Sequence, residues 1–455
     1  MWRAGVCVLV CLCLSVRSQP LVFEDNFDEL DFNVWKHDVT MTGGGNWEFE
    51  MYINNRSVSY VRDGIFYIKP QPTTLELQNQ GNTAGFVYDL QATSPENSCT
   101  STFDFGCQRT VVAAPGGLSV INPVQSALVR TYEAFAFRYG RLEVRAKLPA
   151  GDWLWPAIWL LPEHAKYGPW PVSGEIDLVE SRGNDVSYAP GGRNKFGTTL
   201  HLGHRWSNDA YQAATMQYTH PTPLSDDFHT YGLLWTNDSI ISYIDDPSNV
   251  VLSVSNQDWW NRVLATENFG TGMHNPWATG SPSAPFDHRF YLIFNVAVGG
   301  INGYFPDGVG GKPWNNGAGN AAQLFQQQQA TWLATWNGED AALQIDWVRV
   351  YSDDHAKAPS SGQSPSIQPD NHTIIEVRNI TRTVVEEITN NITNNITENY
   401  TTYVRAQVES LSDDTWSQTE ATRNLLLSFF GSVLASVLCT FGIMRCVAAR
   451  QYTSL

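Results

Sequence analysis

The chain has 455 residues, of which only 16% are charged, and its formal net charge is −17. This acidic excess argues against nucleic acid or an anionic membrane surface as the main partner. The 17 Trp and 18 Tyr residues suit a neutral, hydroxyl-rich ligand better.

Residues 1–18 are predicted to be a secretory signal peptide. Arg3 precedes an apolar run from Ala4 to Val16, and small residues stand on either side of Arg17. This pattern places the cleavage before Gln19, and the run is too short to span a bilayer. We therefore expect the protein to enter the secretory pathway.

Residues 19–352 are predicted to form one all-β domain. Short β-like runs alternate here with Gly, Asn, Asp and Pro turns, and the clearest runs are 64–69, 140–147, 290–295 and 343–351. Because no helical period separates these runs, they indicate one large antiparallel β-sandwich.

Two cysteines, Cys99 and Cys107, remain outside the predicted leader and the C-terminal apolar segment with its tail. In an oxidising compartment two thiols most simply form one disulfide that closes a short loop. No cysteine spacing indicates zinc.

The composition changes after residue 352, and residues 353–423 are predicted to be a flexible linker followed by an N-glycosylated stalk. Apolar residues recur every four positions between residues 380 and 396. This leaves two possibilities open, a self-associating helix and a glycan-stiffened, largely unstructured stalk. The sequons are at Asn371, Asn379, Asn391, Asn395 and Asn399, with two more in the sandwich at Asn55 and Asn237.

The uncharged segment 424–444 is predicted to be a transmembrane helix, since ~20 apolar residues suffice to span a bilayer. Arg445 and Arg450 follow it, which indicates a cytoplasmic tail at 445–455 and a single-pass type I orientation. A buried core helix and a glycolipid-anchor signal are the alternatives, but two arginines after the segment argue against the anchor signal. The expected location is the plasma membrane or an endosomal membrane, with the sandwich outside.

Three acidic residues, Glu175, Asp177 and Glu180, fall within six positions between apolar side chains. On a strand, Glu175 and Asp177 share a face, and a β-bulge before Glu180 returns this third acid to the same face. Three neighbouring carboxylates repel one another, and a pair of them acting on a glycosidic bond would explain that cost. A solvated acidic strand edge is the alternative.

Several segments resemble glycoside hydrolase family 16, in particular animal endo-1,3-β-glucanases and β-1,3-glucan-binding (Gram-negative-bacteria-binding) proteins. The matching segments occur in the family's order, and the cysteine pair falls where that group carries one. The resemblance implies a concanavalin A-like β-jelly-roll sandwich with an open substrate cleft. The segments are 43–50, 54–56, 139–149, 155–162, 173–184, 199–201 and 346–351.

The resemblance also implies roles for individual residues of a retaining hydrolase. Glu175 matches the nucleophile, Asp177 the carboxylate that holds it, and Glu180 the acid/base. The sugar-binding candidates are Asn46, Trp47, Asn54, Arg56, Trp155, Trp159 and His201. A core position is the alternative for the two strand tryptophans, a turn role for Asn54 and Arg56, and a structural role for His201.

Two further features complete these expectations. Trp314 and Trp332 are additional candidates for extending the cleft. The resemblance also implies a structural calcium ion, with Asp346 matching its carboxylate ligand and Glu24 and Gly64 as partners through oxygen atoms, and no cofactor is expected for catalysis.

The expected function is a membrane-anchored endo-1,3-β-glucanase that acts on β-1,3-glucan outside the cell. A receptor that binds β-1,3-glucan in innate immunity, with little or no turnover, is the main alternative. A purely structural surface protein would leave the three acids unexplained. Both glutamates are retained, so nothing in the motif predicts inactivity.

Overall fold

The computed structural model of the protein describes residues 19–91, 98–266 and 274–357. The predicted leader, the stalk with its five sequons, the apolar segment 424–444 and the tail lie outside these residues. Within the described residues, no helix is both long and apolar enough to cross a membrane. The membrane anchor and the stalk therefore stay predictions.

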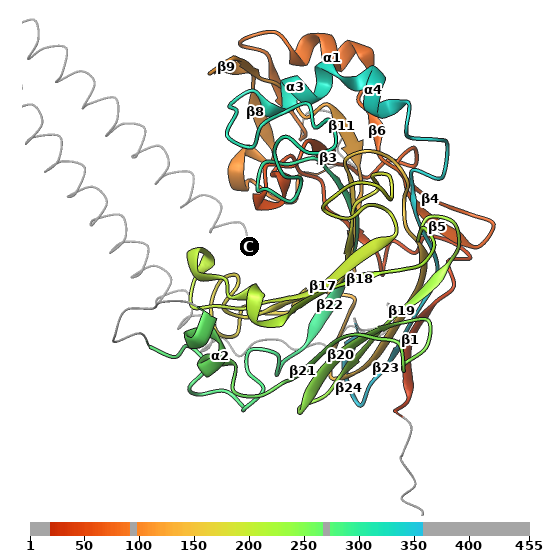
Figure 1. Ribbon diagram of the computed structural model, residues 1–455, viewed down its shortest axis with the longest axis vertical. Coiled ribbons are helices and arrows are strands. Elements are labelled where there is room, and N and C mark those ends of the chain that lie inside the picture. The colour runs from red at the N-terminus through yellow and green to blue at the C-terminus, as the bar shows by residue number, and fades with distance from the viewer. Residues whose placement is uncertain (1–18, 92–97, 267–273, 358–455) are drawn as a thin grey trace, which may run out of the picture. The chain divides into compact units, whose positions relative to one another are not determined.

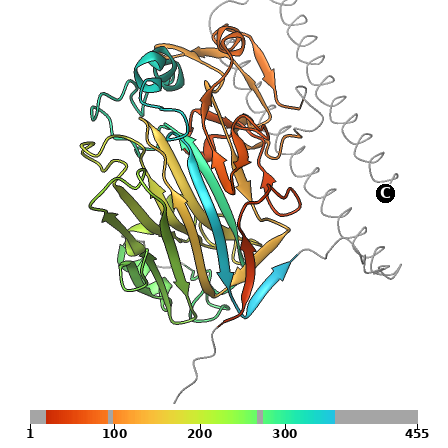
Figure 2. The same cartoon turned by 90° about the vertical axis from the view of Figure 1, so that its right-hand side faces the viewer.

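Two large antiparallel sheets form the body of the fold and face each other as two layers (Figure 1). One sheet has eight strands in the order β21-β20-β19-β14-β23-β5-β4, with β1 paired to β23. The other has nine strands; its main path is β18-β17-β16-β15-β22-β12-β2, while β13 pairs with β22 and β24. Figure 2 shows the broad side of the sandwich, with long strands side by side. The predicted all-β sandwich is confirmed.

The strands of the eight-stranded sheet are β1 (Leu21–Asp25), β4 (Ser59–Arg62), β5 (Ile65–Ile68), β14 (Gly140–Lys147), β19 (His229–Trp235), β20 (Ser239–Ile244), β21 (Val250–Ser255) and β23 (Leu343–Tyr351). Those of the nine-stranded sheet are β2 (Lys36–His37), β12 (Leu128–Arg130), β13 (Phe135–Arg138), β15 (Leu154–Pro162), β16 (Glu175–Ser181), β17 (Lys195–His201), β18 (Thr215–Thr219), β22 (Phe290–Val298) and β24 (Asp354–Lys357).

Three small sheets and several short helices complete the described part of the chain. The small sheets contain β3 (Glu50–Tyr52), β6 (Gln71–Pro72) and β11 (Val124–Ser126); β7 (Val87–Asp89) and β8 (Gln108–Thr110); and β9 (Val112–Ala114) and β10 (Gly117–Ser119). The α-helices are α1 (Leu75–Gly81), α2 (Trp259–Thr266), α3 (Ala321–Gln327) and α4 (Gln329–Leu333), and the 3₁₀ turns are Gly43–Gly45, Phe103–Phe105, Trp206–Asn208 and Tyr211–Ala214.

The residue pattern of each strand matches its place in the sandwich. Along β14 every second side chain is buried, because one face packs on the core and the other faces outward. By contrast, all nine residues of β22 are buried, which suits a central strand covered on both faces. The expected runs 140–147 and 343–351 are confirmed at both ends, as β14 and β23.

Three sequence-based expectations need correction. The domain does not end at residue 352, because β24 pairs with β13. The series of strands is also interrupted by short helices, of which α1, α3 and α4 lie at one end of the sandwich (Figure 1). Trp314 and Trp332 do not extend a cleft: they are 2% and 1% exposed and pack against Phe325 of α3. They bury apolar area between α3, α4 and the sandwich instead.

The predicted disulfide between Cys99 and Cys107 is confirmed. It closes a short loop. This loop is also held by a hydrogen bond to the segment after β2, in which the amide of Thr100 donates to the carbonyl oxygen of Val39. The two sequon asparagines of the sandwich, Asn55 and Asn237, are exposed, so both are accessible to glycosylation.

Candidate active site

The three acids lie on β16, which is an inner strand of the nine-stranded sheet between β15 and β17. The register against β17 shifts between Asp177 and Glu180, because Thr199 pairs with Asp177 while Gly197 pairs with Glu180. One extra residue on β16 therefore restores Glu180 to the face of the other two acids. The predicted bulge is confirmed. The apolar residues between the acids are fully buried in the core: Ile176, Leu178 and Val179.

Glu175 receives a hydrogen bond from an indole that lies outside the strand. Nε1 of Trp170 donates to Oε2 of Glu175 over 2.7 Å. Trp170 stands in the segment between β15 and β16, and its side chain is 44% exposed. The donor thus covers the acid from the solvent side and orients its carboxyl group.

Asp177 faces a histidine that is held from its other side by a second aspartate. Nε2 of His201 lies 3.1 Å from Oδ2 of Asp177, in an ion pair. Nδ1 of the same ring lies 2.5 Å from Oδ2 of Asp209. Because β16 and β17 are paired, with Glu175 opposite His201, the ring is brought to the acids by the sheet register itself.

Glu180 lies beside a stack of three flat groups. Nε1 of Trp155 donates to Oε1 of Glu180 over 2.9 Å. The Trp155 ring stacks on Tyr304 with centroids 3.9 Å apart, and the guanidinium of Arg182 lies 3.9 Å from the Tyr304 centroid. Arg182 also donates from Nε and Nη2 to the Tyr304 carbonyl oxygen, which fixes this stack in place.

Burial and mutual charge set the protonation of these groups. Burial, followed by the charge of Asp177, raises the pKa of Glu180 to about 7. The same two causes, in the same order, raise the pKa of Glu175 well above its usual range. Burial alone would lower the pKa of His201, but the hydrogen bonds and charges of its acidic neighbours outweigh it and raise this pKa to about 12. His201 is therefore an imidazolium cation at neutral pH, and its charge opposes the upward shifts of both glutamates.

A buried polar chain links the glycine-rich loop to the strand beside the acids. Asn46 donates to Oε1 of Glu48 over 3.0 Å, and the Tyr52 hydroxyl donates to the other oxygen of Glu48. Asn295 of β22 donates to the Tyr52 oxygen over 2.9 Å and accepts from Nε1 of Trp159 over 2.7 Å. Since Trp159 pairs with Asp177 across β15 and β16, this chain ends next to the acids.

Trp47 and Trp155 illustrate the two surroundings found for the expected sugar-binding aromatics. Trp47 is 43% exposed, in a left-handed backbone conformation (φ 53°), with the guanidinium of Arg109 5.9 Å from its ring. Trp155 is only 7% exposed and makes the contacts with Glu180 and Tyr304 described above. Trp47 can therefore offer a ring face to a ligand, whereas Trp155 mainly donates a hydrogen bond to Glu180.

Asn54 and Arg56 lie away from the acids. Arg56 donates to Asn54 and lies 3.2 Å from Nε2 of His37 on β2. In the sheet order β2 is four strands from β16, which at ~4.8 Å a strand is about 19 Å. A hollow of about 190 Å³ adjoins this pair, lined by Phe32, Trp35, Lys36, His37, Val39, Asn54 and Ser98. Only an extended ligand could contact both this region and Glu175.

The two acids expected to hold calcium are each paired with an arginine. Asp346 is paired with Arg145, and Glu24 accepts a 2.8 Å hydrogen bond from Arg349. Gly64 stands at the turn between β4 and β5 with φ 74°. Within the described residues, the groups of three side chains with ligand atoms within 4.8 Å of one another contain neither acid. The calcium site therefore stays a prediction, and Gly64 could contribute to it only through its backbone oxygen.

The structure adds residues to this site that sequence reasoning missed. No local pattern distinguishes Trp170, Asp209 or Tyr304, because each comes from a connection between strands. Glu48 is different, because it lies within one of the family-like segments and is a buried acid. An acid next to Asn46 and Trp47 in a glycine-rich loop was a usable signal.

Comparisons of the sequence with known proteins point to one family. The sequence profile described as glycosyl hydrolases family 16 matches residues 96–283. A β-1,3-glucan-binding protein from Penaeus monodon is 45% identical over 365 residues, which cover 76% of this chain and 97% of that protein. Gram-negative bacteria-binding protein 1 from Drosophila melanogaster is 33% identical over 352 residues, 75% of this chain and 66% of that protein.

Bacterial proteins are more distant. Glucan endo-1,3-beta-glucosidase A1 from Niallia circulans is 27% identical over 349 residues, covering 74% of this chain and 39% of that protein. The crystal structure of the laminarinase from Rhodothermus marinus aligns with a TM-score of 0.45 and 24% identity, over 73% of this chain and 97% of that one.

Proposed function

Because the chain belongs to glycosyl hydrolases family 16, we propose that it is an endo-acting 1,3-β-glucanase that cleaves with retention of configuration. One observation carries this proposal. Three carboxyl groups share one face of β16, and burial raises the pKa of one of them, Glu180, to about 7. At neutral pH this group is protonated in roughly half of the molecules, as a general acid requires.

In the first step, Glu180 donates its proton to the glycosidic oxygen while the Glu175 carboxylate attacks C1 of the sugar. The C1–O bond to the leaving chain breaks, and a glycosyl ester forms on Glu175. Positive charge that develops at C1 favours the ionised form of Glu175, against the burial that otherwise keeps it protonated. The charge of the His201 imidazolium lowers the pKa of Glu175 and so favours the same ionised form.

In the second step, the Glu180 carboxylate removes a proton from water, and the resulting hydroxide equivalent attacks C1. The ester bond to Glu175 breaks, and the product leaves with the original β configuration. Glu180 ends the cycle protonated again. The Trp155 donor stabilises the carboxylate form that this step needs.

The substrate assignment rests on the relatives, whose names give β-1,3-glucan as a bound or hydrolysed polymer. Trp47 offers an exposed ring on which a sugar can stack, and Asn54 and Arg56 offer polar groups beside β2, four strands from β16 in the sheet order. This spread of candidate contacts suits a polymer cleaved within its length.

The test is to incubate the purified chain with laminarin and to measure new reducing ends against a Glu175→Gln control. We expect the wild-type rate to exceed the control by at least ~10³-fold, with proton NMR detecting the β-anomer first. An initial α-anomer would refute retention. No release above the control, with laminarin binding intact in both proteins, would refute the enzyme.

A second candidate function is recognition of β-1,3-glucan with little turnover, in innate immunity. The name of the 45% identical relative favours it. The same experiment separates the two functions, because a receptor would bind laminarin equally well with or without Glu175 and release no reducing ends.

We further propose that the domain acts outside the cell on a type I membrane anchor. The predicted leader at 1–18, the apolar segment at 424–444 and a disulfide that needs an oxidising compartment support this. Deletion of 424–455 should release the protein into the medium. Retention of the truncated chain in the cell-surface fraction would contradict the anchor.

A further inference from the structure

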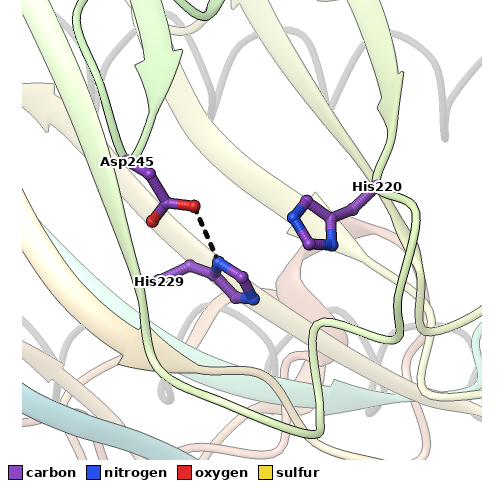
Figure 3. Close-up of side chains that lie close together, drawn as sticks. All are labelled: His220, His229 and Asp245. Atoms are coloured by element: carbon purple, nitrogen blue, oxygen red, sulfur yellow. Dashed lines mark hydrogen bonds and ion pairs between the residues drawn. The ribbon is translucent and has the colours of Figure 1, made fainter.

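A second group of side chains with metal-binding chemistry consists of His220, His229 and Asp245 (Figure 3). His220 follows β18 of the nine-stranded sheet, whereas His229 begins β19 and Asp245 follows β20 of the eight-stranded sheet. The chain from 220 to 229 crosses from one layer to the other. These three residues therefore connect elements of both sheets.

Each of the three side chains offers one ligand atom, and these atoms lie within 4.8 Å of one another. Nδ1 of His229 is 2.9 Å from Oδ2 of Asp245, and the centroids of the two imidazole rings are 4.5 Å apart. Figure 3 shows the ring of His220 turned toward the other two residues. The three side chains thus converge on one point.

The backbone holds two of these side chains in place. Nδ1 of His220 lies 2.9 Å from the carbonyl oxygen of Thr222, so Nε2 is the ring nitrogen that remains for a ligand. Oδ1 of Asp245 accepts from the amide of Thr230 over 2.9 Å, which leaves Oδ2 toward His229. Such hydrogen bonds to the outer side of a ligand are typical of metal sites.

The ring of His229 is incompletely satisfied. Its side chain is only 11% exposed, and its buried Nε2 has no hydrogen-bond partner among the described residues. A buried polar atom without a partner costs free energy. Among the described residues, the Asp245 carboxylate is thus the one hydrogen-bond partner of the His229 ring, at Nδ1, where the ion would bind.

We propose that His220, His229 and Asp245 bind one divalent transition-metal ion of the zinc type, with water as the remaining ligand. Two imidazoles and one carboxylate suit zinc, whereas calcium and magnesium prefer oxygen ligands only. The ion takes the place of the proton between His229 and Asp245, and that proton leaves to solvent.

The geometry requires only a small closure. Ligand atoms about 2.0–2.2 Å from a tetrahedral zinc ion are ~3.3 Å apart. The separations within this group therefore shorten by about 1.5 Å at most. Asp245 is 48% exposed, so its side chain can make this adjustment without disturbing the core.

Glu175, Asp177 and His201 form the other such group within the described residues, so the experiment must separate the two. The full chain is prepared without a histidine tag, stripped with EDTA and titrated with zinc chloride. Bound zinc and the thermal midpoint are measured together. We expect one zinc ion per chain and a rise in Tm of roughly 5 °C or more at saturation.

The variants His220→Gln and Asp245→Asn test the assignment from both sheets. We expect each to weaken zinc binding at least ~10-fold and to abolish most of the Tm rise, while laminarin hydrolysis without zinc stays unchanged. His164→Gln, at an exposed loop position, is the matched control and should behave like wild type. Calcium chloride in place of zinc should give no rise in Tm.

Equal zinc binding in wild type, His220→Gln and Asp245→Asn would overturn the proposal. If zinc binding is lost only in His201→Gln, the ion binds at the acidic face of β16 instead, and the proposal is overturned as well. Both test variants are compared with wild type in EDTA, where equal Tm values exclude a folding defect. If one of them is destabilised, the other decides the outcome.

Discussion

The indole N–H of Trp155 donates a 2.9 Å hydrogen bond to Oε1 of Glu180, across the pairing of β15 with β16. This bond stabilises the charged form of the acid, while burial and Asp177 favour the neutral form and leave the pKa at about 7. The pKa of Glu180 determines the pH range in which this residue can act first as an acid and then as a base.

Trp155→Phe should therefore move the alkaline limb of the pH profile to higher pH. Without the donor, the Glu180 carboxylate is less stable and its pKa rises. The profile of kcat/KM on laminarin between pH 4 and 10 measures this shift. Trp159→Phe is the matched control, because that indole donates to Asn295 instead. An alkaline limb that stays near pH 7 in Trp155→Phe would contradict this account of Glu180.

His201→Gln should move the acidic limb of the same profile to higher pH. The imidazolium lowers the pKa of Glu175, so its loss makes ionisation of the nucleophile harder. We expect kcat/KM at pH 6 to fall by about 10- to 100-fold. Asp209→Asn keeps the ring but removes one of its two acidic partners, and an intermediate shift is expected. If both variants lower the rate equally at every pH, His201 does not act through charge.

Trp47→Ala should weaken glucan binding by about fivefold, which corresponds to ~1 kcal/mol for the loss of one stacking surface. Titration calorimetry with laminarin oligosaccharides in a Glu175→Gln background measures this affinity without hydrolysis. Trp347→Ala is the control, because Trp347 lies on β23 of the other sheet with Arg349 4.2 Å from its ring. Equal losses in both variants would place the sugar outside the region of Trp47.

Glu48→Gln should make the protein less sensitive to alkaline pH. Burial raises the pKa of Glu48 and of its neighbour Glu50, so the folded chain keeps protons that the unfolded chain releases above about pH 4.5. The stability these groups contribute is complete below that pH and is lost as the pH rises. Between pH 5 and pH 8, the free energy of unfolding in urea should therefore fall less in Glu48→Gln than in the wild type. Glu24→Gln, at an exposed ion pair, should keep the wild-type difference.

Features that depend on a few neighbouring residues were predictable from the sequence. The alternation along 140–147 predicted β14 at both ends, and the spacing of Glu175, Asp177 and Glu180 predicted the bulge. In both cases the side-chain period of a strand determines the face on which each residue lies. The disulfide was predictable because two cysteines alone were expected in the oxidising compartment.

Features that depend on distant segments were decided by the tertiary structure alone. Trp314 and Trp332 are of the residue type that stacks on sugars but lie in the core, where Phe325 of α3 packs against both. Likewise, the cation beside the acids arises because β17 brings His201 opposite Glu175 and a later turn supplies Asp209. Burial and nearby charge depend on segments that are distant in the sequence. The sequence therefore identified the acids but could not predict their pKa values.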